Sequence, residues 1–398
     1  MTTTLLLDLD DTLLDTNMDD FVPVYFRALS KALEKDVASD VMLPALIAGT
    51  RMMLANDDPA TTLMQAFDRH FFPAVGIPKE ILGVSIDRYY EETFPSLEAV
   101  ISTRPDAVAF ANWALESGYR LAIATNPVFP LRAIQHRLRW AGLPVEEFPF
   151  ALVSSYETFH FTKSLPAYFI EVVATMGWPD GPVIMIGNDI NMDLVPAAQA
   201  GLPTFWINYG GDAVADDEIP HGGFSDLMAW LGTLDQSSAL PMFTTTTSIL
   251  ATLRAIPAAL SSLIQAVPAR SLLSRPHVGE WCLTEILCHF RDVEAEVNLP
   301  RVRQVLTQEN PFMPGVVSDD WVITRKYAQQ DGLDALARFI QSRKELLRWI
   351  SAPEFVWDRP TRHAIFGPTN IQEIIKFICE HDKAHIQQAW KTIQSLGD

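Results

Sequence analysis

Two aspartates near the start of the chain stand where acidic side chains can take part in chemistry. The apolar run over residues 4–7 has the pattern of a short strand buried in a parallel sheet, and it leads into Asp8 and Asp10. Side chains of an extended chain repeat every second residue, so both carboxylates are expected on one side. Like charges held together repel, which favours a bound cation or a proton transfer over a simple Asp-rich turn.

Further polar residues follow later apolar runs of the same kind. They are Thr125 after the run 119–124, Asp189 and Asp193 after the run 182–186, and Lys163 before a helical stretch between the two. Open α/β sheets bind ligands at the carboxyl ends of their strands, so we expect these side chains near the first two aspartates. Lys163 is the only lysine in the segment 126–188. Taken alone, it can equally be a solvated lysine at a helix start.

This order of motifs resembles the haloacid dehalogenase-like hydrolase superfamily over residues 1 to about 210. Any one of the motifs is weak evidence, whereas four in order at strand ends are strong. The motifs are Asp8-Leu9-Asp10-Asp11-Thr12, Thr125 in Ala122-Ile123-Ala124-Thr125-Asn126, Lys163 in Lys163-Ser164-Leu165-Pro166, and Gly187-Asn188-Asp189-Ile190-Asn191-Met192-Asp193.

The resemblance implies a phosphatase acting on a small phosphorylated substrate. Asp8 would attack phosphorus and form an aspartyl-phosphate, and Asp10 would protonate the leaving alcohol and later activate water. Thr125 and Lys163 would bind phosphate oxygens. Dehalogenating members lack the second carboxylate of the first motif, so Asp10 favours phosphatase over dehalogenase.

The same resemblance implies a Mg²⁺ cofactor. Asp8, the Asp10 carbonyl and Asp189 would supply hard oxygen ligands, and Asp193, four residues after Asp189, would hold the metal or its waters. Two positions depart from the family's pattern. Asp11 stands where Gly is frequent, and Ser164 stands where Pro is frequent.

Three histidines form a second candidate site. His381 and His385 lie one turn apart on one predicted helix, and His289 lies within another. Histidines from two helices can meet in a bundle core and bind Zn²⁺ or Ni²⁺ with a position left open. The alternative is a satisfied core histidine, His289, with two solvent-facing neighbours. His363 is expected in a loop, and Cys288 is expected to be a packed core thiol.

The residues around these histidines resemble the DinB-like family of metal-binding helical bundles over about 245–395. The segments that carry the likeness are Trp281–Phe290 and His381–Gln388. Some members of this family act as thiol transferases. The bundle is therefore read in three ways: a metal site of uncertain role, a metal-dependent thiol transferase, or a docking or dimerisation module that makes a homodimer.

The elements that must position these residues fall into two patterns. Strands alternate with helices up to about residue 235, which predicts a doubly wound, Rossmann-like parallel sheet. Amphipathic stretches over about 248–267, 282–308, 332–351 and 370–395 predict a four-helix bundle with little else. We therefore expect a multidomain α/β and all-α protein: a core over 1–15 and 99–235, a helical cap over 16–98, a linker over 236–247, and a bundle over 248–398. Nothing in the cap names a substrate, although Arg51, Arg69 and Arg88 could meet an anion.

Composition limits the partners and the compartment. The net charge of the 398 residues is -19, which argues against nucleic-acid binding. Residues 1–240 carry 13 basic and 32 acidic side chains, whereas residues 241–398 carry 17 of each. The three cysteines are too few for a disulfide framework. No membrane span or signal segment is expected, so we expect a soluble cytoplasmic protein.

Overall fold

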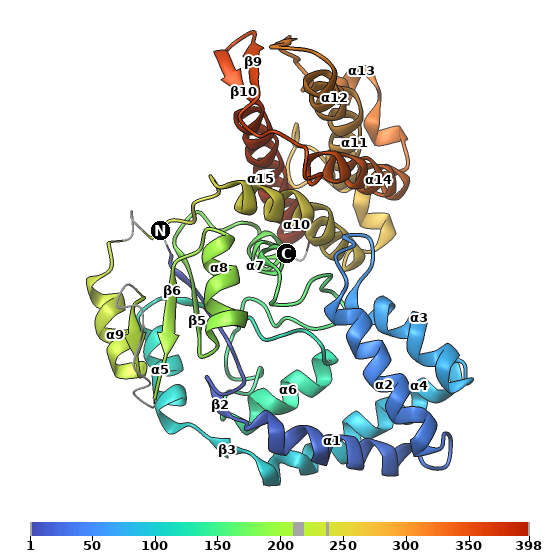
Figure 1. Cartoon of the computed structure of the whole chain (residues 1–398), viewed down its shortest axis with the longest axis vertical. Helices are drawn as coiled ribbons and strands as arrows, with labels where there is room; N and C mark the ends of the chain where they lie inside the picture. The colour runs from blue at the N-terminus through green and yellow to red at the C-terminus, as the bar shows by residue number, and fades with distance from the viewer. Residues whose placement is uncertain (1, 210–218, 236–238, 397–398) are drawn as a thin grey trace. The chain divides into compact units, whose positions relative to one another are not determined.

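The computed structural model describes residues 2–209, 219–235 and 239–396 (Figure 1). The chain divides into two compact units. The first comprises Met1–Val172 with Pro179–Met242, and the second comprises Phe243–Asp398 with Val173–Trp178. Residues 236–238 of the predicted linker lie outside the described residues.

A five-stranded sheet forms the centre of the first unit. Its order is β4-β1-β5-β6-β7, and all neighbouring strands are parallel. β1 is buried on both sides, in keeping with its uninterrupted apolar sequence. The predicted parallel α/β fold is confirmed. The strands are β1 Thr4–Leu7, β4 Arg120–Ile123, β5 Val183–Gly187, β6 Thr204–Ile207 and β7 His221–Gly222.

Helices connect these strands in the expected alternation. They are α5 Pro105–Glu116, α6 Leu131–Trp140, α7 Pro166–Thr175, α8 Val195–Gln199 and α9 Phe224–Thr233. The strand expected over 150–154 is wrong in part, because only an isolated bridge joins Ile123 and Val153. The Ala151 amide still donates to the Leu121 carbonyl, so the segment follows the edge of β4 without becoming a regular strand.

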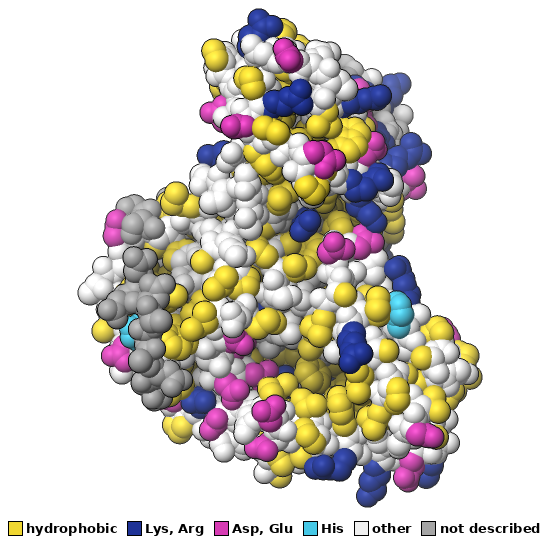
Figure 2. Space-filling model, viewed as in Figure 1, with side chains coloured by type: hydrophobic (Ala, Val, Ile, Leu, Met, Phe, Trp, Pro, Cys, Tyr) yellow, Lys and Arg dark blue, Asp and Glu magenta, His cyan; other side chains and the backbone are white. Residues whose placement is uncertain are grey.

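The helical insertion expected after β1 is formed by α1 Met18–Leu33, α2 Ser39–Leu54, α3 Leu63–Val75 and α4 Lys79–Arg88. Buried residues of α1 recur every fourth position, as the sequence indicated; they are Phe21, Tyr25, Leu29 and Leu33. Two irregular helical turns, Tyr89–Thr93 and Phe94–Val100, lead back to the core. Hydrophobic side chains are frequent on the visible face of these helices (Figure 2). The segments before and after the insertion pair as a two-stranded antiparallel ribbon, formed by β2 Leu14–Asp15 and β3 Ser102–Thr103.

The second unit contains a four-helix bundle. Its long helices are α10 Thr246–Gln265, α11 Leu283–Val293, α14 Gly332–Ile350 and α15 Ile371–Ser395, and α11 continues through a wide turn, Glu294–Asn298, into α12 Leu299–Thr307. α11 packs on α14, and α10 packs on both α14 and α15. The expectation of little besides helices is wrong. β8 Phe312–Met313, β9 Pro360–His363 and β10 Gly367–Asn370 form a small sheet, whose strands are too short to give a periodic signal.

α10 is long and apolar enough to cross a membrane by length and composition alone. However, 78% of its apolar window is buried inside the protein. Ile249, Leu253 and Ile256 have no exposed surface, which fits a core helix of the bundle.

Candidate functional site

Asp8 lies at the carboxyl edge of the central sheet. Its backbone amide donates to the Ile186 carbonyl at 2.9 Å, so β5 fixes the position of the first residue beyond β1. The residue is only 6% exposed. A carboxylate in such surroundings needs polar partners, and the neighbouring chain segments supply them.

Lys163 joins two carboxylates at this edge. Its Nζ lies 2.5 Å from Asp8 Oδ1 and 2.5 Å from Asp193 Oδ1, and all three side chains are almost fully buried. Burial alone would lower the pKa of Lys163, but the carboxylates of Asp193 and Asp8 raise it above its ordinary value. Lys163 is therefore a buried cation rather than the solvated lysine of the alternative interpretation.

Asp193 and Asp189 take different positions. Asp193 Oδ2 accepts the Asp189 amide at 3.0 Å, and burial together with the Asp8 charge raises the pKa of Asp193 to about 7. A Cβ at Gly187 would collide with the Asp193 carboxylate, so only glycine permits this approach. Asp189 is exposed, and its Oδ1 accepts the amides of Asn191 and Met192. The structure thus brings Asp193 to Lys163, while the Asp189 carboxylate caps the helical turn that follows it.

Thr12 and Asn188 complete the surroundings of Asp8. The Thr12 hydroxyl contacts Asp8 Oδ2 at 2.9 Å and Asn188 Oδ1 at 3.0 Å. Both residues lie in the quoted motifs, but no role was predicted for them from the sequence. Each oxygen of Asp8 therefore has its own partner, which fixes the plane of the carboxylate.

Asp10 forms an ion pair with Arg137, whose side chain is 1% exposed. Arg137 comes from α6, and nothing in its spacing singled it out from the other arginines of that helix. Burial lowers the pKa of Arg137 to about 10, against the opposing effect of Asp8. The neighbouring Asp11 has a φ of 56°, a conformation that suits glycine and is also open to Asp. This explains how the first motif accommodates its departure from the family's pattern.

Thr125 is buried directly after β4, whose Ile123 pairs with Leu7 of β1. Its carbonyl accepts the Tyr168 hydroxyl at 2.7 Å, which holds the start of the loop against α7. The next side chain, Asn126, accepts the Lys163 amide at 3.3 Å. The second and third motifs are thereby joined. The predicted anion contacts Arg51, Arg69 and Arg88 are all exposed on the helical insertion.

The three predicted histidines meet in the second unit. His289, His381 and His385 place their ligand atoms within 4.8 Å of one another, with His289 Nε2 lying 3.0 Å from His381 Nε2. Neither a solvent-facing pair nor an isolated core histidine describes this arrangement. The prediction of a loop for His363 is wrong, because His363 lies in β9. Its ring stacks on Phe366. Cys288 is fully buried, as predicted.

The surroundings of His289 and His385 favour neutral imidazoles. Burial, followed by the charges of neighbouring histidines, lowers the pKa of His289 to about 3 and that of His385 to about 4. The Nδ1 atoms of His381 and His385 contact Asp382 Oδ1 at 3.1 Å and Gln388 Oε1 at 2.8 Å. These contacts leave the Nε2 atoms of both rings free to face the cluster, as in histidines that bind a metal.

Two family models match the chain. A model described as haloacid dehalogenase-like hydrolase matches residues 2–201, and the DinB superfamily model matches residues 252–389. No curated protein matches the chain significantly.

Solved structures are similar to one part of the chain or the other. A 2-haloacid dehalogenase from Pseudomonas syringae pv. Tomato is 21% identical and covers 58% of this chain and 99% of its own, with a TM-score of 0.42. A HAD phosphatase from Thermococcus onnurineus is 18% identical and covers 61% and 100%, with a TM-score of 0.38. YfiT from Bacillus subtilis, which has an unusual four-helix bundle topology, is 16% identical and covers 37% and 86%, with a TM-score of 0.34.

Proposed function

The chain belongs to the haloacid dehalogenase-like hydrolases over residues 2–201 and carries a DinB superfamily domain over residues 252–389, and from this premise we propose that its first unit is a Mg²⁺-dependent phosphatase. The observation that carries the proposal is the buried cluster of Asp8, Lys163 and Asp193, with Asp10 two residues beyond Asp8. A halide leaving group needs no proton, whereas an alcohol does. The second carboxylate therefore favours phosphate monoesters as substrates.

Asp8 is the nucleophile of the proposed reaction. One of its oxygens bonds to phosphorus as the bond to the alcohol oxygen breaks, giving an aspartyl-phosphate. Lys163 and Thr12 hold the two oxygens at 2.5 and 2.9 Å, so the carboxylate is oriented before the substrate arrives. Lys163 and Thr125 then face the negative charge of the transferred group.

Asp10 moves the protons. In its protonated form it gives a proton to the departing alkoxide, and as a carboxylate it takes one from the water that attacks the aspartyl-phosphate. The ion pair with the buried Arg137 side chain fixes the orientation of the Asp10 carboxyl group. Arg137 acts on the reaction through Asp10 and is a positioning residue.

The acidic cluster fits a magnesium ion. Asp8 and Asp193 share a single ammonium group, and burial together with the negative charge of Asp8 raises the pKa of Asp193. Carboxylate and carbonyl oxygens are the ligands that Mg²⁺ prefers. Asp8, the Asp10 carbonyl and Asp193 would hold the ion, whereas the Asp189 carboxylate accepts the backbone amides of Asn191 and Met192. Bound there, the ion would neutralise charge on the phosphoryl oxygens.

Turnover of p-nitrophenyl phosphate tests the phosphatase. We expect wild-type activity that EDTA abolishes and Mg²⁺ restores, and a loss of at least about a thousandfold in Asp8→Asn. Asp106→Asn, on α5, is the matched control and should retain activity. Full activity in Asp8→Asn would reject the covalent mechanism.

We also propose that the second unit binds one transition-metal ion through His289, His381 and His385. The convergence of three imidazoles supports this, since Zn²⁺ and Ni²⁺ bind neutral imidazole and the pKa values of His289 and His385 are lowered. Metal analysis of purified protein should give one equivalent in wild type and much less in His381→Ala. His277→Ala, at an exposed position, is the control. Equal metal content in the two variants would refute the site.

A further inference from the structure

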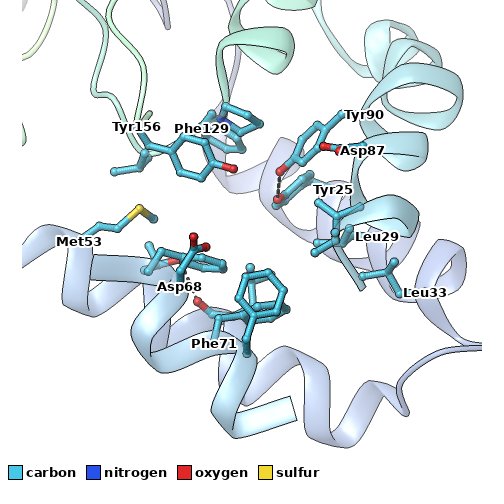
Figure 3. A pocket seen from close by; sticks show the side chains of 18 of the residues that line it. Tyr25, Leu29, Leu33, Met53, Asp68, Phe71, Asp87, Tyr90, Phe129 and Tyr156 are labelled. Atoms are coloured by element: carbon cyan, nitrogen blue, oxygen red, sulfur yellow. Dashed lines mark hydrogen bonds between the residues drawn. The ribbon is translucent and has the colours of Figure 1, made fainter. Parts of the chain in front are cut away.

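A cavity of about 610 Å³ lies among the helices of the insertion in the first unit (Figure 3). Helices α1 to α4 provide most of its wall, and the side chains are mainly apolar or aromatic. Figure 3 shows Phe129, Tyr156 and Tyr90 on one side and Met53, Asp68 and Phe71 on the other. Interiors of proteins are close-packed, so an apolar space of this size is suited to a small-molecule ligand rather than to packing alone.

Part of the cavity wall belongs to the loop that follows Thr125 of the candidate active site. Val128 and Phe129, which line it, come a few residues after Thr125 in the same loop. The Phe129 ring centroid lies 5.3 Å from the Arg137 guanidinium, and Arg137 pairs with Asp10. The Tyr156 amide donates to the Phe129 carbonyl, so this part of the wall is fixed to the loop. The cavity wall and the proton-transferring carboxylate are thus linked through one buried arginine.

The charges on the wall are unsuited to a second anionic group. Among the described residues that line the cavity, Asp68, Glu80 and Asp87 are acidic, and Lys79 is the only basic one. Lys79 already pairs with Asp68 at 2.5 Å. The exposed arginines of the insertion, which the sequence offered as anion contacts, do not line the cavity. The wall therefore favours a neutral hydrocarbon over a sugar bisphosphate or a nucleotide.

We propose that the substrate is a phosphate monoester of an apolar alcohol, with its hydrocarbon part in this cavity and its phosphate at Asp8. The proposal rests on the phosphatase proposed above and assigns its substrate class. Burial of the hydrocarbon supplies binding energy remote from the phosphate, which allows specificity without polar contacts.

A series of n-alkyl phosphates from ethyl to decyl, used below micelle-forming concentrations with the full chain and Mg²⁺, tests the proposal. We expect kcat/KM to rise about fourfold for each added methylene until the cavity is filled. A decyl chain carrying a second phosphate at its far end should lose most of this gain, because the acidic wall opposes it.

Gly83→Leu, which adds a side chain to the cavity wall, tests the same proposal from the side of the protein. Gly83 lines the cavity within α4, and a Cβ there meets only Lys79 Cγ, at 3.9 Å, so a side chain can be added without distorting the helix. The variant should lower kcat/KM for decyl phosphate at least about tenfold, and that for ethyl phosphate by much less. Gly232→Leu adds the same side chain at an open position of α9 and should change neither.

The outcomes separate the two proposals. A flat dependence on chain length, or a Gly83→Leu variant that turns over decyl phosphate normally, overturns the substrate class and leaves the phosphatase intact. Failure of the wild-type protein to hydrolyse any ester, p-nitrophenyl phosphate included, overturns the phosphatase itself.

Discussion

Lys163 forms ion pairs with two carboxylates in a site that is almost fully buried. Its side chain is 2% exposed, and those of Asp8 and Asp193 are 8% and 2% exposed. Removing the ammonium would leave two buried acidic groups without their shared cation, and buried charges without partners are costly. Because Lys163 lies next to the proposed nucleophile, its ammonium group can also stabilise the negative charge of the transition state.

Lys163→Met should therefore lower kcat for p-nitrophenyl phosphate by about a hundredfold or more. Lys31→Met, at an exposed position of α1, should leave kcat within about twofold of wild type. Steady-state kinetics at saturating Mg²⁺ measure both. Equal kcat values for the two variants would remove Lys163 from the mechanism.

The sequence predicted some contacts at this site and missed others. Asp8, Lys163 and Asp193 were expected to meet because each lies in a motif at or after a strand end. The Asp189 carboxylate accepts two backbone amides of the following turn, and the spacing of residues in the motif does not distinguish this position from that of a metal ligand. The contact of Arg137 with Asp10 spans most of the first unit's sequence and leaves no local pattern.

The principal elements were more predictable than their irregular neighbours. Four sheet strands and the four long bundle helices follow apolar runs or helical periodicity, so their existence was visible in the sequence. β7, β8 and the β2–β3 ribbon contain two residues per strand, too few to show alternation. The segment 150–154 has the apolar character of a strand, but its pairing with β4 is limited to one bridge.

Two glycines of the insertion should respond in opposite ways to alanine. Gly76 follows α3 with a φ of 72°, which alanine adopts at a cost of about 1–2 kcal/mol. Gly83 lies inside α4, where alanine is favoured by up to about 1 kcal/mol. Urea unfolding should show Gly76→Ala less stable and Gly83→Ala more stable than wild type. A shift of the same sign in both would contradict the backbone conformations described.

A buried ion network joins three helical segments of the bundle. Arg343, on α14, donates to Glu294 at 2.6 Å and to Asp382 at 2.7 Å, and none of the three side chains is more than 1% exposed. Asp382 also contacts the His381 ring, so the network reaches the histidine triad. Loss of the Arg343 side chain would leave the carboxylates of Glu294 and Asp382 buried without this cation.

Arg343→Ala should destabilise the bundle by about 3–5 kcal/mol, as expected when a buried ion pair loses one partner. Arg338→Ala, on the same helix, removes an arginine that is 68% exposed and paired with Asp334, and should change stability by no more than about 0.5 kcal/mol. Chemical denaturation followed by circular dichroism compares them. Similar midpoints would show that the network contributes little.

Across the whole molecule, the two units offer two different sets of candidate metal ligands. The first unit offers oxygen ligands in an acidic segment, where residues 1–240 carry 13 basic and 32 acidic side chains. The second offers imidazole nitrogens in a segment with 17 of each. The candidate ligands of each site come from within one unit, so each site should bind or lose its metal ion independently of the other.

Exchanging the variants between assays tests this independence. His381→Ala should lose its transition metal yet hydrolyse p-nitrophenyl phosphate within about twofold of wild type. Asp8→Asn should lose hydrolysis yet keep its transition metal in the bundle. A loss of both properties in either variant would show that the sites are coupled.

The most direct measurement is the identification of the phosphorylated residue during turnover. Acid quenching of the enzyme with p-nitrophenyl phosphate, followed by peptide mass spectrometry, should find a phosphate on the peptide containing Asp8, and the label should disappear after hydroxylamine treatment. The same peptide from Asp8→Asn should remain unlabelled. Phosphate on any other residue, or hydrolysis that continues in Asp8→Asn, would contradict the nucleophilic role of Asp8.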